Sequence, residues 1–253
     1  MSNLMVIKKS LIDPKTQAQI KMALPANVTP EKFVRVAMTA LNNSQDLANC
    51  TPESVMNGLL KCAADGLLPD NREAALVKFG NQAQYMPMVY GLIKRMRNSG
   101  EVSTVNAYIV YENDDFEFEI INGEEKIIHK PKLIGDRGQF ILVYAVVSLK
   151  DGGRHVEVMT KADVDKTREA SRSKDSPAWK NWYDEMAKKA VIHRAAKRVP
   201  TASEVEDMIQ RDYKVSMTGT DEDPAKEKNL IDNLNEAIEV DLVSDAEVVN
   251  EDK

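Results

Sequence analysis

The chain has 253 residues, of which 43% are hydrophobic and 29% charged, and this composition suits a globular protein with a buried core. Its formal net charge is −6, but this charge is unevenly distributed. Residues 220–253 hold twelve acidic and three basic residues, a net of −9. The rest of the chain holds 31 basic and 28 acidic residues, a net of +3. The longest apolar run, residues 140–149, is about half of what a bilayer requires, and the first twenty residues lack the apolar block of a signal peptide. We therefore expect a cytoplasmic protein without a membrane span.

Helix-start signals recur in the first third of the chain. Thr29-Pro30-Glu31 supplies an N-cap, a first-turn proline and an acid in order, and apolar residues follow at helical spacing. Thr51-Pro52-Glu53 repeats the same signal, and Gly66 is expected to end that second helix. This third of the chain is therefore predicted to be helical.

From Ala74 the pattern changes to strands. Residues 75–86 predict a short hairpin, residues 88–98 a helix closed by Ser99-Gly100, and residues 102–160 a strand-rich region. The predicted strands of that region are 105–111, 116–121, 126–129, 140–149 and 155–159, with Asn122-Gly123 and Asp151-Gly152-Gly153 at hairpin turns. The class is α+β: an antiparallel sheet and hairpins packed with helices.

The last third is predicted to be helical and then acidic. Ser176-Pro177 opens a long helix that runs to about Val199, and residues 203–214 predict one more helix. Residues 218–224 have linker chemistry, and the acidic residues beyond them carry apolar residues at near-helical spacing. We expect one large domain over residues 1–217, and a linker with a short partner-binding helix over 218–253.

Sequence motifs for covalent chemistry are missing. No Gly-Lys dipeptide occurs, so there is no P-loop, and no His-Glu-x-x-His or Gly-x-Ser-x-Gly is present. Cys50 and Cys62 have no cysteine or histidine nearby and predict reduced, half-buried thiols. Asp114-Asp115 with Glu124 and Lys126 could be offered as a metal-nuclease set, but their place beside a hairpin turn favours solvated edge charges.

The long C-terminal helix carries the most distinct cationic pattern. Val191, Ile192, Ala195, Ala196 and Val199 share one helical face, and the basic residues occupy the opposite half. No acid falls between Met186 and Pro200, and a row of fixed cations is what a phosphate backbone requires. The DNA-binding residues predicted on this helix are Lys189, His193, Arg194, Lys197 and Arg198.

Two further basic sets and a few aromatic residues extend this prediction. One set is Lys94, Arg95 and Arg97, expected to lie near Lys78 of the first hairpin, and the other includes Lys161, Arg172 and Lys174, near a small, polar segment expected to be flexible. Tyr85 is predicted to stack on bases, whereas core packing is the favoured interpretation of Trp179 and Trp182.

Several segments, in this order, resemble the RecT family of phage recombinases. They are residues 64–70, Tyr85-Met86-Pro87-Met88, Tyr90-Gly91-Leu92-Ile93, residues 97–102, residues 110–116, and Trp182 with residues 186–194 up to Pro200. The resemblance covers about residues 24–214 and does not include the acidic tail. One departure is His193, where the family often has arginine or lysine, and this histidine would make DNA affinity pH-sensitive near neutrality.

The resemblance implies a protein that binds single-stranded DNA and anneals it to a complementary strand in homologous recombination. It implies no catalytic residues, no ATP and no required cofactor, with magnesium a modulator at most. It also implies homo-oligomeric rings or helical filaments in the cytoplasm of a bacterial host cell, the annealed duplex as product, and a companion exonuclease. We expect the tail to recruit that exonuclease or the host single-strand binding protein. Two alternatives stay open: a metal-dependent nuclease of DNA ends, and a structural or protein-interaction phage protein without enzymatic activity.

Overall fold

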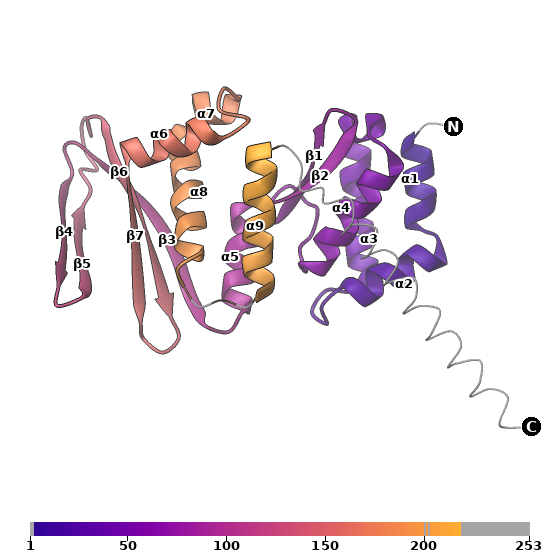
Figure 1. Cartoon of the computed structure of the whole chain (residues 1–253), viewed down its shortest axis with the longest axis horizontal. Helices are drawn as coiled ribbons and strands as arrows, with labels where there is room; N and C mark the ends of the chain where they lie inside the picture. Colours follow the sequence, from indigo (N-terminus) through magenta and orange to yellow (C-terminus); the bar gives the residue numbers. More distant parts are fainter. Residues whose placement is uncertain (1–2, 200, 202, 219–253) are drawn as a thin grey trace, which may run out of the picture. The chain divides into compact units, whose positions relative to one another are not determined.

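The computed structural model of the chain describes residues 3–199, 201 and 203–218. These residues form helices and antiparallel sheets, which confirms the α+β class (Figure 1). Their contacts divide them into two compact units, and the boundary follows Gly91 within α5 (Val89–Asn98). The linker and helix predicted after residue 218 lie outside the described residues, so the functional division at residue 218 stays a prediction.

In the first unit, the described residues pack four α-helices with a hairpin. Its elements are α1 (Asn3–Leu11), α2 (Pro14–Ala23), α3 (Pro30–Asn43), the 3-10 helix η1 (Asp46–Asn49), α4 (Pro52–Ala64), β1 (Ala74–Phe79) and β2 (Gln82–Pro87). Asp13, Thr29 and Thr51 each cap a helix that begins with proline, and each side chain accepts a hydrogen bond from a backbone N–H of the first turn. The two predicted helix starts are therefore confirmed.

The hairpin of the first unit lies against α4. β1 and β2 pair antiparallel from Ala74 opposite Pro87 to Phe79 opposite Gln82. The Ser54 hydroxyl on α4 accepts a hydrogen bond from the Ala83 backbone N–H at 2.9 Å. This helix also holds Cys62, which like Cys50 is a thiol outside any disulfide, as predicted; both are fully buried, whereas half-buried thiols were expected.

The second unit is built around a three-stranded antiparallel sheet. Its elements after the first turn of α5 are β3 (Val102–Tyr111), β4 (Asp115–Ile121), β5 (Glu124–Lys130), β6 (Phe140–Leu149), β7 (Arg154–Thr160), α6 (Lys161–Ala170), α7 (Pro177–Asn181), α8 (Tyr183–Ala196) and α9 (Ser203–Thr218). The strand order is β3-β6-β7, and all five predicted strands are present, extended by one to three residues at some ends.

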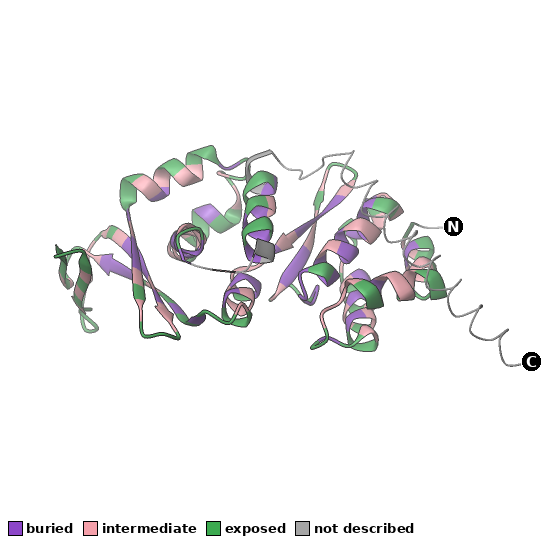
Figure 2. Cartoon of the chain, turned by 60° about the horizontal axis from the view of Figure 1, so that its bottom comes forward, coloured by how far each residue is buried: buried purple, intermediate pink, exposed green. Residues whose placement is uncertain are grey.

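The two faces of this sheet are covered by different elements. Figure 1 shows α8 on one face and the β4–β5 hairpin on the other. Residues alternate along a strand, so Val110, Tyr144 and Val156 face the hairpin and pack against its Phe116 and Ile127. The hairpin is otherwise mostly exposed (Figure 2).

The turn of this hairpin matches its sequence. Asn122 and Gly123 both have positive φ, 53° and 86°, as the two central residues of a type I′ turn require. The pairing of Ile121 with Glu124 across this turn fixes the register back to Asp115 opposite Lys130.

Among the described helices, none combines the length and apolar character that crossing a membrane would need.

Candidate DNA-binding surface

The predicted long helix of the second unit is two helices. α7 ends at Asn181 and α8 begins at Tyr183, because the backbone of Trp182, at φ −134° and ψ 44°, leaves the helical region. α8 then packs on all three strands of the sheet and also contacts α6 and α9. It is therefore a central helix, not a helix with one face open to solvent along its length.

The cations of α8 meet acids that come from other elements. Lys189 Nζ and His193 Nε2 lie 3.9 and 3.3 Å from Oδ2 of Asp212 on α9. Arg194 Nε and Arg198 Nε lie 2.7 and 3.1 Å from the carboxylate of Glu157 on β7. The chain has no acid between Met186 and Pro200, but acids distant in sequence compensate part of this basic stripe.

His193 is neutral near physiological pH. Burial lowers its pKa from 6.5 to about 4, and although Asp212 opposes this, the positive charges of Lys189 and Lys197 lower the pKa further. The predicted pH sensitivity of DNA affinity near neutrality is therefore contradicted, since this imidazole does not change its charge between pH 6 and 8. Its side chain, 16% exposed, is also too covered to present itself to a phosphate.

The end of α8 is where its positive charge reaches solvent. Lys197, the C-cap of the helix, and Arg198 just beyond it are exposed, and Arg194 is half-buried. Lys197 Nζ lies 4.3 Å from the centre of the Tyr213 ring, which orients the lysine without neutralising it. Cations at this position also complement the negative end of the helix dipole.

A second group of cations lies on α6 and in the segment after it. Lys161 Nζ pairs with Asp165 at 2.7 Å, and Lys174 Nζ pairs with Glu169 at 2.8 Å, both on the surface. Arg172 is exposed. Surface ion pairs of this kind contribute little to stability, so these lysines can exchange a carboxylate for a phosphate. α6 contacts α8, so the two cationic groups belong to the same unit.

The remaining predicted residues lie on α5, β1 and β2, and they differ in exposure. On α5, Arg97 is exposed, whereas Lys94 and Arg95 are half-buried. Lys78 is exposed on β1 of the first unit. Tyr85 of β2 is 4% exposed, and its hydroxyl donates a hydrogen bond to Asp65 at 2.8 Å. Tyr85 is thus a core residue, which corrects its predicted role as a stacking platform.

Trp182 and Tyr108 are aromatic residues that are exposed, unlike Tyr85. Trp182 is 66% exposed, contrary to the core interpretation, whereas Trp179 is 3% exposed as that interpretation predicts. Tyr108 on β3 is 47% exposed and was not singled out from the sequence. The only sequence signal for Tyr108 is its place in a strand with Val110, and that alternation does not distinguish a covered face from an open one.

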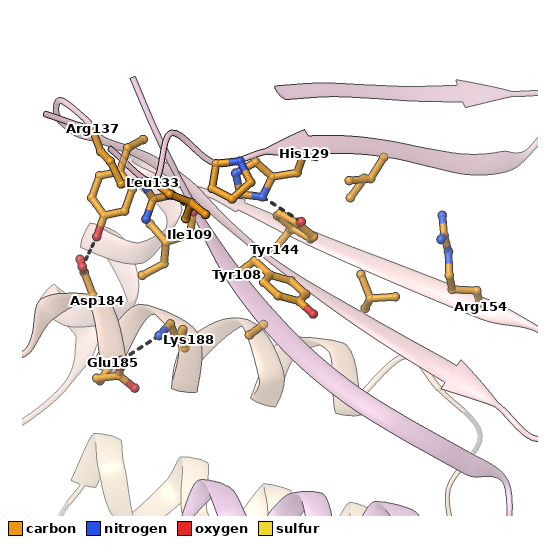
Figure 3. A pocket seen from close by; sticks show the side chains of 15 residues that line it. Tyr108, Ile109, His129, Leu133, Arg137, Tyr144, Arg154, Asp184, Glu185 and Lys188 are labelled. Atoms are coloured by element: carbon orange, nitrogen blue, oxygen red, sulfur yellow. Dashed lines mark hydrogen bonds and ion pairs between the residues drawn. The ribbon is translucent and has the colours of Figure 1, made fainter. Parts of the chain in front are cut away.

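Tyr108 lies at a groove beside β3, with a volume of about 600 Å³ (Figure 3). Its ring centre is 5.4 Å from that of Tyr144, and the groove is also lined by His129 and Arg154. On the other side of the groove, Asp184 accepts a hydrogen bond from the Tyr111 hydroxyl. Burial is the main cause that raises the pKa of Tyr111 to about 12, and this hydrogen bond is the second. The groove thus joins aromatic rings and cations with acids that already have partners.

Asp114, expected to be a solvated edge charge, is buried at the foot of the hairpin. Its carboxylate accepts hydrogen bonds from Arg137 and from the Lys132 backbone N–H, and it lies 3.2 Å from His129 Nε2. Both oxygens are therefore engaged within the fold. In the part of the chain that the structure describes, no group of three His, Cys, Asp or Glu side chains is placed to hold a metal ion.

Comparison with known proteins agrees with the resemblance seen in the sequence. The model of the RecT family matches residues 31–229. Protein RecT of Escherichia coli (strain K12) is 33% identical over 236 residues, which cover 88% of this chain and 87% of that protein. The match spans both structural units and is far longer than any single motif. The chain therefore belongs to the RecT family.

Proposed function

We propose that this protein binds single-stranded DNA and anneals complementary strands without ATP or covalent chemistry. Membership of the RecT family supports a single-strand annealing protein of DNA recombination. The observation that carries the site is the group of exposed cations at the end of α8, Lys197 and Arg198, on a helix that is fixed against the sheet. Fixed cations bind phosphates irrespective of sequence, as annealing of arbitrary strands requires.

In the proposed mechanism, the backbone of the first strand lies on these cations and on those of α6. Binding through phosphates leaves the base edges open for pairing with the second strand. Trp182 and Tyr108 offer exposed rings on which an unstacked base can rest, a contact that every base can make. Pairing and stacking within the nascent duplex then drive the reaction, so no nucleotide hydrolysis is needed.

The same proposal extends to assembly and partners. Side-by-side copies, in rings or helical filaments, would hold a strand longer than one subunit can cover. The residues after 218, with their strong negative charge, would repel DNA and instead recruit a companion exonuclease or the host single-strand binding protein. Such a protein would act in the bacterial cytoplasm, with magnesium as a modulator at most.

The proposal is tested by mixing the protein with two complementary oligonucleotides, one of them labelled, without ATP and with or without magnesium. We expect rapid conversion of the labelled strand to duplex, and no conversion with a non-complementary strand. Shortened labelled strands in magnesium would instead indicate a nuclease. No binding and no conversion would favour the protein-interaction alternative.

A further inference from the structure

Glu157 on β7 connects two of the DNA-binding candidates. Its side chain is 4% exposed, and its two oxygens contact different arginines. Oε1 lies 2.7 Å from Arg194 Nε, and Oε2 lies 3.1 Å from Arg198 Nε. Arg194 lies in the last turn of α8, and Arg198 lies in the turn just beyond the helix, where its backbone N–H donates a hydrogen bond to the Ala195 carbonyl. One buried carboxylate thus holds a pair of guanidinium groups.

Glu157 has more cationic partners than a single carboxylate balances. One carboxylate faces two guanidinium groups, and His155 Nε2 lies 3.4 Å from the same Oε2. The positive charge of Arg194 also helps to lower the pKa of Asp163 on α6, although the hydrogen bonds of Asp163 with Thr160 lower it most. A pair needed only to neutralise a buried carboxylate would require a single arginine. Glu157 and the two arginines taken alone therefore carry a net charge of +1, and the further acids beside this cluster are Asp163 and Glu125, whose Oε2 lies 4.0 Å from His155 Nδ1.

The arginines are anchored at one end and open at the other. Each contacts Glu157 through Nε, the nitrogen nearest to the backbone, while the side chains of Arg194 and Arg198 are 39% and 56% exposed. A guanidinium group has five N–H donors in a fixed fork, so an arginine held through Nε can still offer its outer N–H groups. An arginine that is already held loses less conformational entropy when it binds a phosphate.

We propose that Glu157 is a positioning residue that holds Arg194 and Arg198 for two successive phosphates of single-stranded DNA. This inference rests on the proposed function. It gives a negative residue a favourable role in binding a polyanion, opposite to what its charge alone would produce. Loss of Glu157 weakens DNA binding if the residue positions the arginines and strengthens binding if only its charge matters, so an experiment can separate the two explanations.

The test measures the affinity for a labelled oligothymidylate, and its dependence on salt, for the full chain and for Glu157→Gln. Removal of a negative charge strengthens binding if Glu157 acts only through its charge. Loss of positioning weakens it, and we expect roughly a fivefold loss and a salt slope reduced by about one, comparable to losing one arginine contact. Glu119→Gln, an exposed acid on β4, makes the same charge change and should leave affinity unchanged or slightly raised.

Two further variants keep the test decisive if Glu157→Gln is unstable. Glu157→Asp retains the charge but shortens the side chain by one methylene, and it should also weaken binding. In a chain that carries Arg194→Ala and Arg198→Ala, Glu157→Gln should cost no further affinity, because the groups it positions are gone. Tighter or unchanged binding by Glu157→Gln, or wild-type affinity of Glu157→Asp, would overturn the inference. Failure of the unaltered protein to bind the oligonucleotide would instead overturn the proposed function.

Discussion

Arg137 donates two hydrogen bonds to the buried carboxylate of Asp114, from Nε at 3.1 Å and from Nη2 at 2.5 Å. The same arginine lies 4.3 Å from the centre of the Tyr111 ring. These contacts tie the loop after β5 to the end of β3 and to the foot of the β4–β5 hairpin. The pair keeps the pKa of Asp114 well below its usual range, so the carboxylate is charged in the folded protein.

Asp114→Asn should therefore destabilise the second unit. The amide removes the charge that Arg137 faces, and breaking a buried ion pair costs about 3 kcal/mol or more in the free energy of unfolding. Both tryptophans, Trp179 and Trp182, belong to this unit, so urea unfolding followed by their fluorescence measures the effect directly.

The adjacent residue gives the matched control for this change. Asp115 pairs with Lys130 at 2.8 Å, but both side chains are more than half exposed. Asp115→Asn should leave the urea midpoint nearly unchanged, since exposed pairs contribute little. Equal effects of the two substitutions would mean that the Asp114 network does not stabilise the hairpin.

The buried His193 predicts a loss of stability in acid. Its pKa is about 4 in the folded protein and near 6.5 when unfolded. The unfolded chain therefore binds the extra proton first as the pH falls, so this contribution to stability is intact above pH 6.5 and is lost between pH 6.5 and 4. The slope approaches about 1.4 kcal/mol per pH unit within that window.

His193→Gln removes this titration while keeping a polar side chain of similar reach. Unfolding free energies at pH 7 and pH 5 should differ less for the variant than for the unaltered protein. The comparison at pH 7 accounts for any packing defect, because His193 is neutral there. An unchanged pH difference would assign the acid sensitivity to other groups.

Local sequence signals predicted most of the elements. Capping by Thr29 and Thr51, the Asn122-Gly123 turn and the alternating strands are determined by neighbouring residues, and these elements formed as expected. The same capping logic could have revealed α6, because Thr160 and Asp163 form a capping box there. It could also have revealed α2, where Asp13 precedes a first-turn proline.

The candidate site was harder to predict because its surroundings are non-local. The helical period placed the cations of α8 on one face, but it could not show that Glu157 of β7 and Asp212 of α9 lie against them. Tyr85 and Trp182 show the same limit: Tyr85 was expected to stack on bases and is buried, whereas Trp182 was expected in the core and is exposed. Whether an aromatic ring is covered depends on the packing of elements distant in the chain, and only the fold determines that.

The exposed cations at the end of α8 should control the salt dependence of DNA binding. Lys197→Ala with Arg198→Ala removes two potential phosphate contacts, so we expect weaker binding of an oligothymidylate and a salt slope reduced by about one to two. The affinity is measured by fluorescence anisotropy over a series of salt concentrations. This slope reports phosphate contacts, whereas a general loss of folded protein would lower the amount bound without changing it.

Lys126→Ala with Lys130→Ala is the control for this pair, because it removes the same charge from the exposed hairpin. Its salt slope should stay at the unaltered value. If the control variant and the α8 variant behaved alike, the binding would depend on net charge and not on this surface.

Removing the residues after Thr220 should preserve annealing of naked oligonucleotides. The truncation takes away a net charge of −9 and leaves the more basic part of the chain, including every residue proposed to contact DNA. A phosphate backbone is repelled by the removed segment, so affinity for single strands should be unchanged or higher at low salt, and the difference should shrink as salt screens the charges. The annealing rate with labelled oligonucleotides, measured at two salt concentrations, checks both statements. Loss of annealing on truncation would place part of the DNA-binding or oligomerising machinery in the acidic segment and would refute the division of the chain at residue 218.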